Sequence, residues 1–182
     1  MNLNHSELAN RPQGTIAQML DASRSSCPGM EPASQLRKAR ILVVEDHDFL
    51  REGIVRLLNM QSDLVCCGQA ATLAAAVGGV IQQSPELLLL DIRLPDGDGL
   101  QLIDFVRPLY PNLMILVLSQ SDEVSVARHA LAMGANGYVI KQQASEVLSA
   151  IRELLRGKTY VSKELANRMA GLIPERHSLQ GA

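Results

Sequence analysis

Short apolar runs alternate with stretches of helical periodicity from Arg40 onward, and this alternation restricts the fold more than any other feature of the chain. Five apolar runs are expected to form strands, at 41–45, 64–67, 87–91, 113–118 and 136–140. The stretches that follow them are expected to form helices, at 50–60, 72–81, 100–106, 123–133 and 144–156. Because a crossover helix joins parallel strands, the pattern predicts an α/β fold: a doubly wound, five-stranded parallel sheet with helices on both faces.

Polar side chains follow the predicted strands at the points where they end: Glu45, Asp46, Asp91, Ser119 and Lys141. The carboxyl ends of parallel strands share one edge of the sheet, which is where open α/β sheets bind ligands. Two carboxylates ~4 Å apart repel by roughly 4 kcal/mol at an effective dielectric constant of ~20, so three of them require a cation or a proton. Oxygen ligands suit Mg²⁺, and the backbone carbonyl of Arg93 could also reach the metal while its side chain points to solvent.

A carboxylate nucleophile, Mg²⁺, an ammonium group and a hydroxyl are the components of a phosphoryl-transfer site. Each residue alone has an ordinary alternative. Asp91 could be a helix cap or a turn residue, one of the acids at 45–46 could cap the following helix, and Asp48 is a further N-cap candidate. Ser119 could be an ordinary serine at a strand end, and Lys141 could be a surface lysine. The shared position at strand ends favours the site, because scattered surface residues would seldom fall there.

The charge of the central region argues against nucleic-acid binding by that region alone. Residues 41–157 carry eight Lys and Arg against fourteen Asp and Glu, a net charge of −6. Cys27, Cys66 and Cys67 lack metal-ligand spacing, and Cys66 and Cys67 are expected to pack as small hydrophobic residues in a reducing compartment. The longest apolar stretch, 113–118, is too short to cross a membrane, and no leader pattern precedes it, so we expect a cytoplasmic location.

Three regions are expected along the chain: an N-terminal extension over 1–39, a domain over 40–157, and a linker helix with a tail over 158–182. The extension is rich in Ser, Gln, Pro and Asn, which favours a flexible tail. The alternatives are a short partner-binding helix around 16–20, or leader residues from an upstream start codon. The linker helix is predicted at 163–172, before Pro174.

Residues from Ile41 to Arg156 resemble the receiver domain of two-component response regulators, which has a flavodoxin-like (CheY-like) fold. The matching motifs are Ile-Leu-Val-Val-Glu-Asp-His, Leu-Leu-Leu-Leu-Asp-Ile-Arg-Leu-Pro-Asp-Gly-Asp-Gly, Leu-Val-Leu-Ser and Gly-Tyr-Val-Ile-Lys. The Glu-Asp-His start, the Asp-Gly-Asp-Gly-Leu turn and the tail Gly-Lys-Thr-Tyr-Val-Ser are similar to the NarL/FixJ-type (LuxR-family) group.

The resemblance implies a role for each residue of the predicted site. Asp91 would accept the phosphoryl group, and Glu45, Asp46, Asp91 and the Arg93 carbonyl would hold Mg²⁺. Ser119 and Tyr138 would be the switch hydroxyl and the switch aromatic. Lys141 would pair with a phosphoryl oxygen, and Ser121 would tune hydrolysis of the aspartyl phosphate.

The chain departs from this group in two places. Only 25 residues follow Gly157, too few for the helix-turn-helix domain that usually continues the chain, so DNA binding would need a domain absent from this sequence. Gln142 stands where many receivers have proline, so the cis peptide often found there is not assumed.

The sequence therefore predicts a phosphorylation switch driven by a histidine kinase or phosphotransfer protein, with no membrane contact and no steady-state turnover. The output surface is expected over 123–133, 136–140 and 144–156, and it could support a homodimer. A stand-alone receiver that binds proteins or shuttles phosphate is the alternative. A haloacid-dehalogenase-like phosphatase is disfavoured because Arg93 replaces its second acid, and a vestigial interaction module is disfavoured by the complete set of site residues.

Overall fold

The structure is a computed structural model that describes residues 37–141 and 144–171. The predictions for the N-terminal extension, Cys27, Gln142 and Pro174 lie outside these residues. The main sheet has six parallel strands in the order β2-β1-β3-β6-β7-β8, which is the flavodoxin-like order with one strand added. The strands are β1 (Ala39–Val44), β2 (Leu64–Ala70), β3 (Leu87–Asp91), β6 (Met114–Ser119), β7 (Gly137–Ile140) and β8 (Tyr160–Val161).

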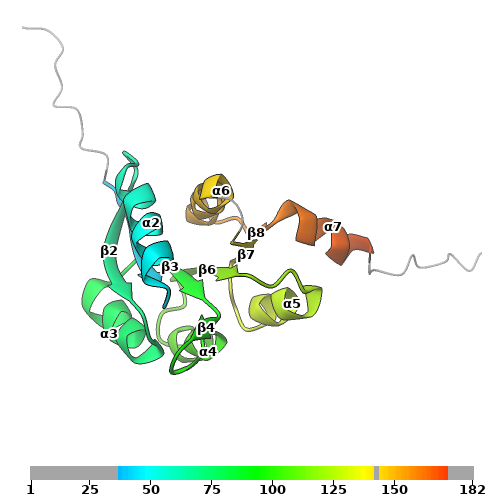
Figure 1. The fold of residues 1–182 in the computed structure, drawn as a ribbon, viewed down its shortest axis with the longest axis horizontal. Helices are drawn as coiled ribbons and strands as arrows, with labels where there is room; N and C mark the ends of the chain where they lie inside the picture. The colour runs from blue at the N-terminus through cyan, green and yellow to red at the C-terminus, as the bar shows by residue number, and fades with distance from the viewer. Residues whose placement is uncertain (1–36, 142–143, 172–182) are drawn as a thin grey trace, which may run out of the picture. The chain divides into compact units, whose positions relative to one another are not determined.

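Helices cover both faces of this sheet. They are α2 (Asp48–Asn59), α3 (Leu73–Gln83), α4 (Leu100–Val106), α5 (Val124–Ala132), α6 (Ala144–Leu155) and α7 (Lys163–Gly171). Figure 1 shows α2 and α6 on one side of the strands, and α3, α4 and α5 on the other. The predicted parallel sheet is therefore confirmed, with β8 as a strand that the sequence did not predict.

Alternation along the buried strands divides the core into two layers, because successive side chains of a strand point to opposite faces. In β3, Leu88 and Leu90 pack on the α3–α4–α5 side, whereas Leu87 and Leu89 pack on the α2–α6 side. All five residues of β3 are buried, as expected for a strand covered on both faces. The strand therefore holds Asp91 rigidly at its carboxyl end.

The start of α2 differs from the prediction. His47, not Asp48, is the N-cap residue, and its Nδ1 accepts a hydrogen bond from the amide of Leu50 at 3.4 Å. Asp48 is the first helical residue, and its carboxylate pairs instead with Arg51. The cap therefore comes from the residue that directly follows the two acids of the predicted site.

The segment after α6 completes the sheet. The β8 strand pairs with β7, and the Ser162 hydroxyl accepts a hydrogen bond from the amide of Ile140 at 3.1 Å. Leu165 of α7 is fully buried in the core layer that contains α5. Arg168 of α7 pairs with Asp122, which precedes α5, at 2.5 Å. These contacts place β8 at the edge of the sheet beside β7 and join α7 to the start of α5 and to the core layer that contains it.

None of the helices within 37–141 and 144–171 has the length and hydropathy needed to cross a lipid bilayer. The two thiols described, Cys66 and Cys67, are free, and burial raises the pKa of both. Both side chains pack as small apolar groups against the core layers, as the sequence suggested.

Arg152 of α6 anchors the loop between α2 and β2, and this contact should depend on pH. Its guanidinium donates to both carboxylate oxygens of Asp63, at 2.8 and 2.9 Å, and holds the pKa of Asp63 below its ordinary value of 3.8. A lowered folded-state pKa contributes stability above about pH 4 that is lost on further acidification. Each of the two side chains is more than a third exposed, so solvent screens the ion pair, which should contribute only about 0.5 kcal/mol to the free energy of unfolding.

We therefore expect Arg152→Met to lower the free energy of unfolding at pH 7 by that amount. The difference from the wild type should shrink as the pH falls below about 4, because the Asp63 carboxylate becomes protonated in both proteins. Urea unfolding at several pH values measures it. A difference that stays constant down to pH 2.5 would show that the ion pair is not its source.

Candidate functional site

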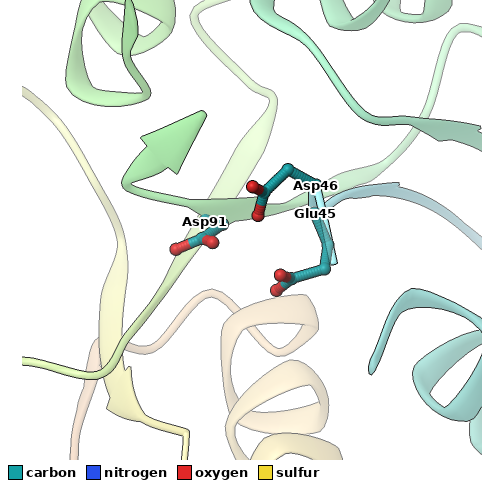
Figure 2. A group of neighbouring side chains, drawn as sticks. All are labelled: Glu45, Asp46 and Asp91. Carbon is teal, nitrogen blue, oxygen red and sulfur yellow. The ribbon is translucent and has the colours of Figure 1, made fainter. Parts of the chain in front are cut away.

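Three carboxylates meet at the carboxyl ends of β1 and β3, where the order of strands reverses direction. Asp91 is the last residue of β3, and Glu45 and Asp46 directly follow β1. One carboxylate oxygen from each residue lies within 4.8 Å of the other two, and Figure 2 shows the three side chains grouped at these strand ends. Glu45 and Asp91 are buried, whereas Asp46 is exposed, so the group opens to solvent on one side.

Lys141, directly after β7, places its ammonium group between the two buried acids. Its Nζ lies 2.6 Å from Oε2 of Glu45 and 2.7 Å from Oδ2 of Asp91. The lysine side chain is itself only 7 % exposed, so these ion pairs are shielded from water. One cation thus offsets part of the charge of three carboxylates, and the group keeps a net negative charge.

Burial raises the pKa of Glu45, the hydrogen bond from Lys141 opposes that rise, and the nearby Asp91 carboxylate adds to it. Backbone amides supply further donors. The amide of His47 donates to Oε1 of Glu45 at 3.3 Å, and that of Arg93 donates to Oδ1 of Asp91 at 3.3 Å. The site therefore favours binding of a further cation, which would reduce the repulsion among the acids.

The donor atoms fit a hard divalent cation. They are carboxylate oxygens on two rigid strand ends, and Asp46 leaves one side open to water and to an incoming anion. Mg²⁺ prefers oxygen ligands and retains several water molecules in such open sites. Glu45, Asp46 and Asp91 are the residues that could hold it.

Ser119 ends β6, the strand next to β3, and its backbone oxygen accepts a hydrogen bond from the amide of Lys141 at 2.9 Å. Its hydroxyl oxygen accepts a hydrogen bond from the amide of Ser121 at 3.0 Å. Tyr138 of β7 is fully buried, and its hydroxyl donates to the backbone oxygen of Ser121 at 2.9 Å. Ser119, Ser121 and Tyr138 thus form one hydrogen-bonded unit at the end of β6.

The predicted residues thus form two groups at the same edge. Direct contacts join Lys141 to two acids, and backbone and hydroxyl contacts join Ser119, Ser121 and Tyr138. The Arg93 side chain is exposed, as the sequence suggested, and its backbone lies against Asp91.

Sequence reasoning missed the structural roles of the Asp-Gly-Asp-Gly turn. Residues Arg93–Leu94 (β4) and Gly97–Asp98 (β5) form a small antiparallel hairpin directly after Asp91. A Cβ atom on Gly99 would lie 2.2 Å from the backbone oxygen of Asp91, so only glycine fits there. Oδ1 of Asp98 accepts a hydrogen bond from the amide of Leu100, at the start of α4, at 2.9 Å. The two glycines and the alternating acids were the signal available in the sequence.

The family model of the response regulator receiver domain matches residues 41–153 of the chain. Among curated proteins, the chain is 33 % identical over 143 residues to "Probable transcriptional regulatory protein NarL" of Mycobacterium tuberculosis, covering 78 % of this chain and 66 % of that protein. It is 31 % identical over 132 residues to "Oxygen regulatory protein NreC" of Staphylococcus carnosus, covering 71 % and 61 %. The chain therefore spans slightly under two thirds of the length of these relatives.

Solved structures give the same result. A LuxR-family two-component response regulator from Aurantimonas sp. SI85-9A1 matches with a TM-score of 0.71 and 28 % identity, over 74 % of this chain and 97 % of that one. The signal receiver domain of NarL from Mycobacterium tuberculosis matches with a TM-score of 0.64 and 32 % identity, over 67 % and 99 %.

Proposed function

The chain belongs to the response regulator receiver family, within the group of NarL- and NreC-type regulators, and from this premise we propose that Asp91 accepts a phosphoryl group from a histidine kinase. The observation that carries the proposal is the Lys141 ammonium, which lies 2.7 Å from Oδ2 of Asp91. It lies beside the oxygen that would attack, where it can pair with the incoming phosphoryl group.

In the proposed reaction a carboxylate oxygen of Asp91 attacks the phosphorus of a phosphohistidine. The phosphorus–nitrogen bond breaks and its electron pair returns to the ring nitrogen. A phosphohistidine that is protonated on its other ring nitrogen thus leaves as neutral imidazole, and an aspartyl phosphate forms. Lys141 would move from the carboxylate to a phosphoryl oxygen, at a distance its flexible stem can cover. Mg²⁺ held by Glu45, Asp46, Asp91 and the Arg93 carbonyl would neutralise charge on the phosphoryl oxygens. The family is a receiver family rather than one of turnover enzymes.

The response would begin at Ser119. Its hydroxyl oxygen already accepts from the amide of Ser121, so its proton is available for a phosphoryl oxygen. The backbone oxygen of Ser121 also accepts a hydrogen bond from Tyr138, so movement of the loop after β6 would displace the side chain of Tyr138 in β7. We assign Ser119 and Tyr138 as the switch pair, and Ser121 as the residue that tunes hydrolysis.

The route outward would continue through β8 and α7. The amide of Ser162 donates to the backbone oxygen of Tyr138 at 3.0 Å, and Asp122, next to Ser121, pairs with Arg168 of α7. The predicted output surface of α5, β7 and α6 therefore includes the attachment point of α7.

The NarL and NreC relatives support two further proposals. One is a homodimer formed through this surface, and the other is control of transcription through a DNA-binding domain beyond the receiver. On the same basis we propose domain boundaries at 39/40 and 157/158, a histidine kinase as the partner, and a cytoplasmic location.

Mg²⁺ should stabilise the protein, and Asp46 should be needed for most of this effect. At a hundred times its dissociation constant, a ligand that binds only the folded state adds about 2.7 kcal/mol to the free energy of unfolding. We expect Asp46→Asn to reduce this gain strongly. Because Asp46 is exposed, the variant and the wild type should have similar stability in EDTA. Thermal unfolding with and without Mg²⁺ measures both values, and an equal gain in the two proteins would contradict the proposed ligand set.

Phosphoryl uptake tests the function directly. The wild-type chain, incubated with radiolabelled acetyl phosphate, should take up label with Mg²⁺ and should not do so in EDTA. A protein that remains unlabelled under both conditions would contradict the proposed function.

A further inference from the structure

The β4–β5 hairpin that follows Asp91 is fastened at its tip to the start of α3. Oδ1 of Asp96 accepts a hydrogen bond from the amide of Leu73 at 2.8 Å, and Oδ2 accepts one from the amide of Ala74 at 3.1 Å. These amides belong to the first turn of α3, which has no acidic residue of its own. Asp96 therefore supplies a negative charge to the positive end of this helix from a distant part of the chain.

A second, apolar contact lies beside this polar one. A Cβ atom on Gly97 would lie 2.8 Å from Cδ1 of Leu73, so the hairpin backbone rests directly against the leucine. Gly97 also has a φ of +153°, a backbone conformation that other residues seldom adopt. The tip is thus held by two adjacent contacts to the same residue of α3.

The base of the same hairpin contacts the carboxylate of Asp91. The amide of Arg93, in β4, donates to Oδ1 of Asp91 at 3.3 Å. This distance is near the upper limit for a hydrogen bond, so a displacement of a few tenths of an ångström would break it. The amide of Gly99 closes the hairpin on the backbone oxygen of Ile92 at 2.6 Å. Only Leu94 and Pro95 therefore separate Arg93, whose amide holds Asp91, from Asp96, whose carboxylate holds α3.

We propose that Asp96 is a positioning residue for Asp91. By fixing the hairpin to α3, it sets the position of the Arg93 backbone, whose amide orients Asp91 and whose carbonyl is the proposed metal ligand. The inference rests on the proposed function, since it assigns Asp96 to the same site. Partners of this kind commonly change metal affinity or activity by about tenfold or more when they are removed.

Asp96→Ala and Thr72→Val form a matched pair of variants. Thr72 is the N-cap residue of α3, and its hydroxyl accepts a hydrogen bond from the amide of Ala75 at 3.1 Å. Both substitutions remove a cap from the same helix end, but only Asp96→Ala releases the hairpin. If weakening of α3 impairs Mg²⁺-dependent phosphorylation, both variants should show the defect. If release of the hairpin impairs it, only Asp96→Ala should show the defect.

The measurement is the Mg²⁺ concentration for half-maximal phosphorylation of the full chain by acetyl phosphate. We expect Asp96→Ala to raise it about tenfold and Thr72→Val to leave it unchanged. Asp96→Asn, which keeps one oxygen acceptor, should restore part of the loss. An unchanged value for Asp96→Ala, or an equal rise for Thr72→Val, would overturn the proposal.

Two further readouts do not depend on phosphorylation. Amide hydrogen exchange at Arg93, followed by NMR, should be faster in Asp96→Ala than in Thr72→Val. Calorimetry should likewise show weaker Mg²⁺ binding by Asp96→Ala than by Thr72→Val. If the wild type takes up no phosphoryl group, the proposed function fails, and these two measurements still decide whether Asp96 positions the site. Equal exchange at Arg93 in both variants would refute that role.

Discussion

Asp91→Asn should abolish phosphoryl uptake, lowering the label from acetyl phosphate to that of a protein-free blank. The amide of asparagine is not a nucleophile, so no aspartyl phosphate can form at this position. The substitution preserves the shape of the side chain, and its Oδ1 can still accept from the amide of Arg93. Lys141 keeps its 2.6 Å contact with Glu45. The free energy of unfolding in EDTA should therefore change by no more than about 1 kcal/mol.

Asp104→Asn is the matched control, because Asp104 is an exposed acid on α4 outside the acidic group. It should take up label as the wild type does. The label on the wild type should also be released by hydroxylamine, which cleaves acyl phosphates. Hydroxylamine-labile label on Asp91→Asn at the wild-type level would show that another residue accepts the phosphoryl group.

Gly99→Ala should strongly lower the free energy of unfolding of the protein. The added Cβ would lie 2.2 Å from the backbone oxygen of Asp91, and neither atom belongs to a side chain that can rotate away. Relief requires movement of the strand end or of the hairpin. We expect a loss of about 3 kcal/mol or more in the free energy of unfolding, a fall in Tm of roughly 6–12 °C. Phosphoryl uptake should fall as well, because the movement displaces Asp91.

Gly53→Ala is the control and should raise the free energy of unfolding instead of lowering it. Gly53 lies in α2, and no heavy atom comes within 4 Å of a Cβ built on it. Alanine there should stabilise the helix by about 0.5–1 kcal/mol. Thermal unfolding of the two variants compares these effects directly. Equal Tm values for Gly99→Ala and the wild type would show that the turn relaxes at little cost.

The parallel sheet was predictable because its signal is repeated and local. Each buried strand is a continuous apolar run, and each carries a polar residue where it ends, as in the four leucines before Asp91. Parallel strands place such ends on one edge whatever the details of the loops. This is why the sequence could predict that Lys141 lies near Glu45 at a sequence separation of 96, although it could not give their 2.6 Å contact.

The parts that escaped prediction depend on contacts between distant segments. The β8 strand has two residues, which is too few for a periodic pattern, and it forms only because β7 offers an open edge. Asp96 resembles any turn aspartate in the sequence, and its role depends on the position of Leu73 in space. Arg107 is similar. It looks like a surface residue after α4, yet it donates to the backbone oxygens of Leu113 and Gly134.

The order of strands also has a consequence for synthesis of the chain. The three carboxylates come from β1 and β3, which pair directly, whereas Lys141 follows Asp91 by 50 residues. Because amino-terminal segments leave the ribosome first, the acids can meet before their ammonium partner exists. Repulsion among them opposes this early pairing, and a divalent cation would relieve it. Addition of β6 and β7 is therefore also the step at which the nascent chain acquires its own counter-charge.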